Sequence, residues 1–292
     1  MLTASDYQRR RAAPWDLMVL PGWWNEELQE CVIHRIHELE ASKHPQTIPF
    51  HVCGVDGQQN YFIKLFHCHG IGDAFKDLFR VSKPKRFWNQ GLALSAAGFL
   101  VPTVVAVGEV RHFKVFRTGF VLTFGIPGQP LPVFLRKREG WRKERGDLKL
   151  KRDGLVRLAD LVRQFHSLGF VHGDLIANNL LVTLVDGEPH FYFMDNDRTS
   201  RFPHWWPARG WKRNLVQLNR MPLPGVTLQD RMRFFCRYLG RGQLSVRERR
   251  LVRWLEQQTR RRRYECDGVG PRGDFRRLMR FSEAVTSIDR QG

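Results

Sequence analysis

The chain has 292 residues, enough for one large domain or two lobes that share a cleft, and its 42% of apolar residues exclude global disorder. Lysine and arginine number 48 against 29 acidic residues, and the net charge of +19 favours polyanionic partners such as nucleic acid, an anionic membrane or a phosphorylated substrate. No apolar stretch is long enough to span a bilayer, no signal peptide is visible, and five dispersed cysteines indicate a reducing compartment.

The N-terminal segment gives few local signals. We expect Trp15, Trp23 and Trp24 to pack over the first lobe rather than to dock on a partner. Residues 31–37 alternate between apolar and polar side chains, which predicts a strand. His34 and His37 lie in it, and because no further ligand set accompanies them, we expect surface histidines rather than a metal site.

A hairpin is predicted next, with strands at residues 48–52 and 60–66 and a turn at 55–57. Lys64 ends the run Tyr-Phe-Ile-Lys, which is similar to the Val-Ala-Ile-Lys strand whose lysine binds the α- and β-phosphates of a nucleotide. The alternative is a solvent-facing strand lysine. No Gly-x-Gly-x-x-Gly precedes it, so the phosphate-covering turn would fall near residues 41–44.

The following segment departs from the kinase pattern. Residues 75–97 predict one or two helices, but no glutamate occurs between Lys64 and Glu109 to pair with the strand lysine as a kinase helix glutamate does. This absence is the best argument for an inactive protein. Strands are expected at residues 102–107 and 120–124, a hinge at 125–128, and a solvated, partly helical basic segment at 136–152.

The most informative stretch begins with a helical apolar stripe from Asp153 to a stop at Gly169. His172-Gly173-Asp174 follows, with Asn179 five residues after Asp174. A hairpin around the turn at residues 186–187 then ends at Asp195, so that Asp195 is expected beside Asn179.

Phosphoryl transfer on the kinase plan needs an aspartate to orient the acceptor and accept its proton, and an asparagine and an aspartate to hold magnesium. The spacing assigns these roles to Asp174, Asn179 and Asp195. The alternative is a buried core histidine at His172 followed by ordinary turn residues. The ordered set of three polar residues among apolar segments favours catalysis. Asp197 either orients its neighbours or faces a second ion, and we favour the orienting role.

Two helices are expected near the C-terminus. Thr227 and Asp230 predict a capping pair and Gly240 a stop for the first. Residues 247–263 predict the second, whose consecutive arginines at 260–263 suit an anionic membrane face, with a plain solvated helix end as the alternative.

Several runs of the chain resemble the bacterial lipopolysaccharide kinase (Kdo/WaaP) family. The runs that carry the resemblance are His172-Gly173-Asp174-Leu175 with Asn179, Met194-Asp195-Asn196-Asp197-Arg198, Lys212-Arg213-Asn214-Leu215 with Asn219-Arg220, and Asp230-Arg231-Met232-Arg233-Phe234-Phe235 with Tyr238-Leu239. The resemblance implies an α+β, two-lobed protein-kinase-like fold, with a β-rich N-lobe at residues 1–127 and a mainly helical C-lobe at 128–292.

The same resemblance implies an ATP- and Mg²⁺-dependent kinase that phosphorylates heptose or Kdo in the lipopolysaccharide inner core. By it Asp174 is the catalytic base, Asn179 and Asp195 are magnesium ligands, and Lys64 binds phosphate. Asn196 departs from the family, which commonly has Phe there, and the helix glutamate is not evident.

We therefore expect a cytoplasmic protein, peripheral at the inner face of the cytoplasmic membrane, whose partners are lipopolysaccharide core or a lipid-linked sugar and an anionic surface. No nucleic acid is expected, because nucleic-acid binding would explain the charge but not the catalytic set. The alternatives are a kinase of another small-molecule or protein acceptor, and a pseudokinase binding module. The pattern leaves the sugar, its hydroxyl and the oligomeric state open.

Overall fold

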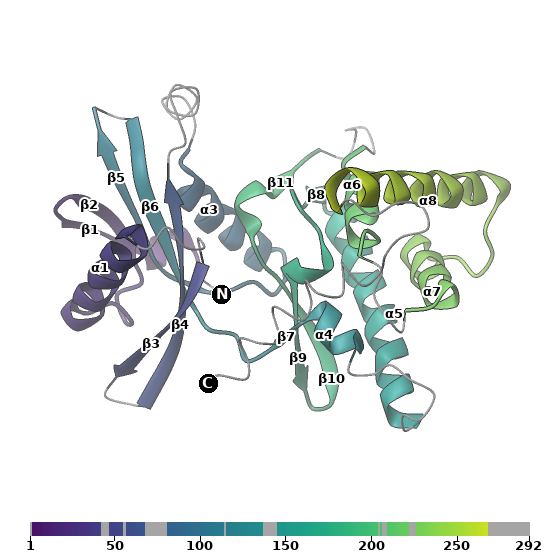
Figure 1. The fold of residues 1–292 in the computed structure, drawn as a ribbon, viewed down its shortest axis with the longest axis horizontal. Coiled ribbons are helices and arrows are strands. Elements are labelled where there is room, and N and C mark those ends of the chain that lie inside the picture. The colour runs from purple at the N-terminus through teal and green to yellow at the C-terminus, as the bar shows by residue number, and fades with distance from the viewer. Residues whose placement is uncertain are drawn as a thin grey trace. The chain divides into compact units, whose positions relative to one another are not determined.

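The computed structural model describes residues 2–41, 47–54, 57–67, 81–113, 115–136, 145–203, 205, 209–221 and 226–267. The chain forms two compact units, which are described separately below (Figure 1). The first comprises Met1–Pro127 and Phe193–Arg198, and the second Gly128–Tyr192 and Thr199–Gly292. The predicted phosphate-covering turn beyond Ala41, the hairpin turn at residues 55–56 and the start of the predicted helix at 75–80 lie outside the described residues.

A six-stranded antiparallel sheet is the centre of the first unit. Its strands, in spatial order, are β1 (Gln8–Ala12), β2 (Trp15–Val19), β5 (Val104–His112), β6 (Val115–Phe124), β4 (Gly57–His67) and β3 (Thr47–Gly54). The predicted β3–β4 hairpin is confirmed. Strand β6 contains the strand predicted at residues 120–124, and β5 overlaps the strand predicted at 102–107 but begins two residues later. The N-terminal segment, which sequence left unassigned, adds the β1–β2 hairpin to one edge.

The predicted strand at residues 31–37 is wrong, because these residues lie within helix α1 (Glu26–Ala41). Val32 and Ile36 are fully buried, and a spacing of four residues places both on one helix face. Seven residues of apparent alternation could not distinguish this pattern from a strand. His34 and His37 are exposed, as expected, and His34 lies 3.7 Å from the Glu38 carboxylate.

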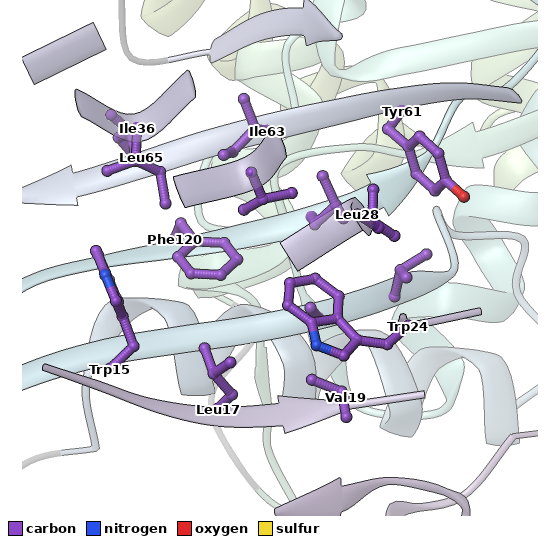
Figure 2. Packing of buried hydrophobic residues seen from close by; sticks show 14 of the residues in the cluster. Trp15, Leu17, Val19, Trp24, Leu28, Ile36, Tyr61, Ile63, Leu65 and Phe120 are labelled. Atoms are coloured by element: carbon purple, nitrogen blue, oxygen red, sulfur yellow. The ribbon is translucent and has the colours of Figure 1, made fainter. Parts of the chain in front are cut away.

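Helices cover both faces of the sheet. The buried side of α1 packs with Trp15, Trp24 and alternate residues of β4 and β6 in one apolar cluster (Figure 2). Helix α3 (Lys83–Ala96), which confirms the later part of the helix predicted at 75–97, contributes to a second cluster with Phe66. Because successive strand residues point to opposite faces and Ile63 belongs to the α1 cluster, Lys64 lies on the α3 face.

Of the three N-terminal tryptophans, Trp15 and Trp24 are buried as expected, and Trp23 is 52% exposed. The Trp23 ring still contacts Phe124 edge to face, at 4.9 Å between centroids. All three therefore take part in packing.

Glu109, the first glutamate after Lys64, is buried on β5 and does not serve that lysine. Its carboxylate accepts hydrogen bonds from Ser82 Oγ at 2.7 Å, Lys85 Nζ at 2.5 Å and Arg111 Nε at 3.1 Å. Burial alone would raise its pKa, but the three donors outweigh burial and lower the pKa below 4.5. Through Ser82 and Lys85, Glu109 thus links the N-terminus of α3 to strand β5.

The second unit is mainly helical. Its helices and strands are β7 (Gln129–Pro130), α4 (Leu131–Arg136), α5 (Arg145–Ser167), β8 (Phe170–Val171), η2 (Ala177–Asn179), β9 (Leu180–Val185), β10 (Glu188–Phe193), β11 (Ser200–Arg201), α6 (Arg209–Leu218), α7 (Leu228–Leu239) and α8 (Val246–Asp267). Of these, β10 ends with Phe193, which already belongs to the first unit. Helices α5 and α7 pack together, as do α6 and α8 (Figure 1).

In this unit the turn, the helix cap and the C-terminal helix that the sequence predicts are confirmed. Asp186 and Gly187 have φ of 52° and 77°, the positive values that a two-residue hairpin turn needs, and they join β9 to β10. Thr227 and Asp230 form the predicted capping box of α7, which ends at Gly240 with φ of 68°. The helix predicted at residues 247–263 is α8.

Helix α5 begins at Arg145, before the predicted start at Asp153, and continues to the predicted stop. Lys151 in its second turn is 6% exposed, and its Nζ lies 3.0 Å from the Asp230 carboxylate. The expectation of a wholly solvated basic segment at 136–152 is therefore wrong at this residue, because a tertiary ion pair buries it. Residues 137–144 lie outside the described ranges.

We expect Glu109→Ala to lower the free energy of unfolding by about 1–3 kcal/mol, because the buried Ser82 hydroxyl and the partly exposed Lys85 and Arg111 lose their shared carboxylate. Urea denaturation at neutral pH measures the change. The matched control is Asp16→Ala, which breaks the exposed Arg9–Asp16 pair (2.8 Å) and should cost less than about 1 kcal/mol. Equal effects of the two substitutions would contradict a special role for Glu109.

Candidate active site

The loop between β8 and η2 carries Asp174. His172 is fully buried in it, and its Nδ1 accepts the Asp174 backbone N–H at 3.1 Å. Asn179 Nδ2 donates to the Asp174 carbonyl at 2.8 Å, so the structure brings Asp174 and Asn179 together as the spacing predicts. His172 is thus buried in the core, as the alternative interpretation expects, and its ring also binds the backbone of the loop at Asp174.

Two carboxamides on α6 hold this loop. Asn214 Nδ2 donates to the His172 carbonyl at 2.5 Å, and its Oδ1 accepts the His172 N–H at 2.9 Å. Gln217 Oε1 accepts the Leu175 N–H at 3.2 Å. Gln217 Nε2 lies 3.2 Å from the Gly173 carbonyl and 3.1 Å from Asp174 Oδ1.

A histidine and a tyrosine lie behind these amides. His166 on α5 contacts Asn214 Oδ1 through Nε2 at 3.2 Å and the Tyr238 hydroxyl through Nδ1 at 2.9 Å. Burial lowers the pKa of His166 to about 4, with the hydrogen bond to Asn214 opposing the shift, so the ring is neutral at pH 7. Burial raises the pKa of Tyr238, which keeps its hydroxyl protonated.

Lys64 and Asp195 meet within the first unit. The ammonium of Lys64 forms an ion pair with Asp195 Oδ1 and lies 5.1 Å from the centre of the Phe66 ring. Asp195 lies two residues after the end of β10 and has φ of 57°, a conformation that aspartate tolerates better than most residues. Among the described residues, the lysine is thus paired with this aspartate and with no glutamate.

The short helix η3 (Asn196–Arg198) directly follows Asp195. Asn196 is fully buried, and its Nδ2 donates to the Phe193 carbonyl at 2.8 Å. Asp197 is 8% exposed, and burial raises its pKa, with Lys64 opposing the rise and Asp195 adding to it. Asp197 is thus buried two residues after Asp195, and its orienting role stays a prediction.

The donor set suits a hard cation such as Mg²⁺, which prefers carboxylate and amide oxygens. Asp195 supplies a carboxylate. Asn179 uses its amide nitrogen on the Asp174 carbonyl, which leaves the amide oxygen as the atom for a cation. The roles of Lys64, Asp174, Asn179, Asp195 and Asp197, and the expected approach of Asp195 to Asn179, remain predictions.

An apolar cavity of about 140 Å³ lies elsewhere in the second unit. Residues of α4 to α8 line it, among them Leu135, Leu158 and Leu255. Asp174 and Asn179 are not in its wall, so this cavity is separate from the loop that carries them.

The chain is similar to known proteins of one family. The model of the Lipopolysaccharide kinase (Kdo/WaaP) family matches residues 39–238, more than half of the chain and a range that contains every candidate site residue. A solved structure described as "WaaP in complex with acyl carrier protein" is similar, with a TM-score of 0.54 and 21% identity over 78% of this chain and 92% of that chain. At this identity the likeness establishes the kinase-like α+β fold alone. No curated protein matches the chain.

Proposed function

The chain belongs to the lipopolysaccharide kinase (Kdo/WaaP) family, and from this membership we propose that it transfers the γ-phosphoryl group of ATP to a hydroxyl of heptose or Kdo in the lipopolysaccharide inner core. Members of the family are kinases, so the chain is a phosphotransferase with an alcohol group as acceptor. The observation that most supports catalysis of transfer by this chain is the pair of hydrogen bonds at Asp174: Asn179 donates to its carbonyl, and Gln217 donates to its carboxylate.

In this proposal Asp174 accepts the proton of the sugar hydroxyl as the hydroxyl oxygen attacks the γ-phosphorus. The bond between that phosphorus and the β,γ-bridging oxygen breaks, and ADP leaves. Lys64 would bind the nucleotide phosphates, and Asp195 and Asn179 would hold Mg²⁺, which would neutralise charge on those phosphates. Asp197 orients Asp195. Arg213 is exposed beside the loop, with Nη2 3.4 Å from the Gly173 carbonyl, where its charge suits an acceptor that carries carboxylates or phosphates.

A pseudokinase is the second candidate, since Lys64 has no glutamate partner among the described residues. The ion pair between Lys64 and Asp195 instead supports an active kinase, because this contact holds the lysine beside the expected metal ligand. Turnover with a defined acceptor decides between the two.

The first prediction concerns Asp174→Asn. Incubation with labelled ATP, Mg²⁺ and purified core oligosaccharide, followed by mass spectrometry, should show phosphorylated sugar with the wild-type protein and a rate lower by about 10²–10⁴-fold with the variant. ATP binding should be nearly unchanged, because Asp174 serves the acceptor. A variant with near wild-type turnover would remove Asp174 from the mechanism, and a wild-type protein that binds ATP without transfer to core sugars or other acceptors would support the pseudokinase.

The second prediction separates Asp195 from Asp197. Asparagine is the better replacement at both positions, because it tolerates the positive φ of Asp195 and keeps the size of the side chain. Asp195→Asn should abolish Mg²⁺-dependent ATP binding, whereas Asp197→Asn should change that affinity by less than about tenfold, or 1.4 kcal/mol. Calorimetric titration of Mg-ATP into both variants measures this, and the reverse order of effects would exchange the two roles.

Membrane association is the remaining part of the proposal. In the described part of the chain, no helix is both long enough and apolar enough to cross a bilayer. On α8, Arg260, Arg261 and Arg262 are exposed, whereas Arg263 donates to the Asn219 carbonyl at 2.8 Å and serves the C-terminal end of α6. The three exposed arginines are the part of the basic run that we propose to contact an anionic surface.

The third prediction tests this contact. Cosedimentation with vesicles of anionic lipid should fall as salt rises, since screening acts over about 10 Å at 0.1 M salt. Replacing Arg260, Arg261 and Arg262 by Gln should weaken binding by up to about 1 kcal/mol per residue. The matched control replaces the exposed Arg9, Arg10 and Arg11 of β1, with the same change in net charge, and should retain binding. Salt-independent binding, or equal losses in both triple variants, would contradict docking through α8.

A further inference from the structure

Tyr238, His166, Asn214 and Gln217 form one hydrogen-bonded chain that ends on the Asp174 carboxylate. Its five members come from α7, α5, α6 and the loop after β8. The contacts are Tyr238 Oη to His166 Nδ1 at 2.9 Å, His166 Nε2 to Asn214 Oδ1 at 3.2 Å, Asn214 Nδ2 to Gln217 Oε1 at 3.0 Å and Gln217 Nε2 to Asp174 Oδ1 at 3.1 Å.

The direction of every bond in this chain can be assigned. Asn214 Oδ1 already accepts the His172 N–H, so it is an oxygen, and His166 must donate to it through Nε2–H. The neutral His166 ring then has Nδ1 as an acceptor, and Tyr238 donates to it. Each donor therefore points towards Asp174.

Gln217 is the member that touches Asp174. Its Oε1 is fixed by the Leu175 N–H, so its Nε2 must face the Gly173 carbonyl and the Asp174 carboxylate. The side chain is 8% exposed and on a helix, which leaves the amide little freedom. One carboxamide thus fixes the backbone on both sides of Asp174 and the orientation of its carboxylate.

Given the kinase activity proposed above, we infer that Gln217 is a positioning residue that acts through Asp174, and that Asn214, His166 and Tyr238 set its orientation. A carboxylate misplaced by 1 Å can lose about 10²-fold in rate, so this constraint matters for transfer. All five members of the hydrogen-bonded chain belong to the second unit, whereas Lys64 and Asp195 belong to the first, so we expect Gln217 to affect transfer and not nucleotide affinity.

The test compares Gln217→Glu with Gln164→Glu, an equal charge change at an exposed position of α5. Gln217→Glu keeps the acceptor for Leu175 N–H but loses the donor to Asp174, and kcat should fall about 10²-fold with KM for ATP little changed. Gln164→Glu should match the wild type. Tyr238→Phe removes only the last donor and should lower kcat by about 2- to 10-fold, the factor for one hydrogen bond.

A double-mutant cycle distinguishes positioning from a general structural effect. If Gln217 acts through Asp174, adding Gln217→Glu to Asp174→Asn should leave the residual single-turnover rate unchanged. An additive loss, or wild-type kcat in Gln217→Glu, would overturn the inference.

Hydrogen exchange gives a readout that does not depend on the acceptor. Gln217→Ala should speed exchange in the peptide that contains the Leu175 amide, because that N–H loses its acceptor. Unchanged exchange would also overturn the inference. The two results can differ. If Gln217→Ala exchanges faster but the wild-type protein transfers no phosphate to any acceptor, the proposed function is wrong and the role of Gln217 in holding the loop stands.

Discussion

The loop that carries Asp174 depends on hydrogen bonds from side chains because its own backbone forms no helix or ladder there. Buried backbone groups need partners, and unpaired ones cost about as much as a lost hydrogen bond. Asn214 supplies both a donor and an acceptor to His172, as a neighbouring strand would. A carboxylate could only accept, so an amide is the side chain that matches a peptide group on both sides. The position of α6, and of the helices that hold it, therefore determines the shape of the loop.

Sequence predicted the parts of this structure that local chemistry determines. The Asp186-Gly187 turn and the Thr227–Asp230 capping box follow from the conformations and hydrogen bonds of a few adjacent residues. The strand predicted at residues 31–37 failed because burial of α1 depends on partners in distant strands. The fold class, in turn, was implied by the resemblance of several runs to one family rather than by any single motif.

Asn214 and Gln217 were missed as site residues for a related reason. They act on groups 42 and 43 residues away, and no local spacing reports such a contact. One signal was present: on α6 both amides flank Leu215 and Val216, and all four side chains are buried. Polar residues on the apolar side of a helix need buried partners, and this requirement could have marked them.

The pairing of Lys64 with an aspartate rather than a glutamate is explained in part by the contacts of the nearby charged residues. Glu109 accepts hydrogen bonds from Ser82, Lys85 and Arg111, so it could serve Lys64 only by giving up these three hydrogen bonds. Lys64 instead pairs with Asp195, whose position after β10 is set by the hairpin. Because side chains alternate along a strand, a turn one residue longer or shorter would shift the register of β10 and exchange its buried and exposed faces. The positive φ values at Asp186 and Gly187 define that turn, and they therefore help to determine which carboxylate faces the lysine.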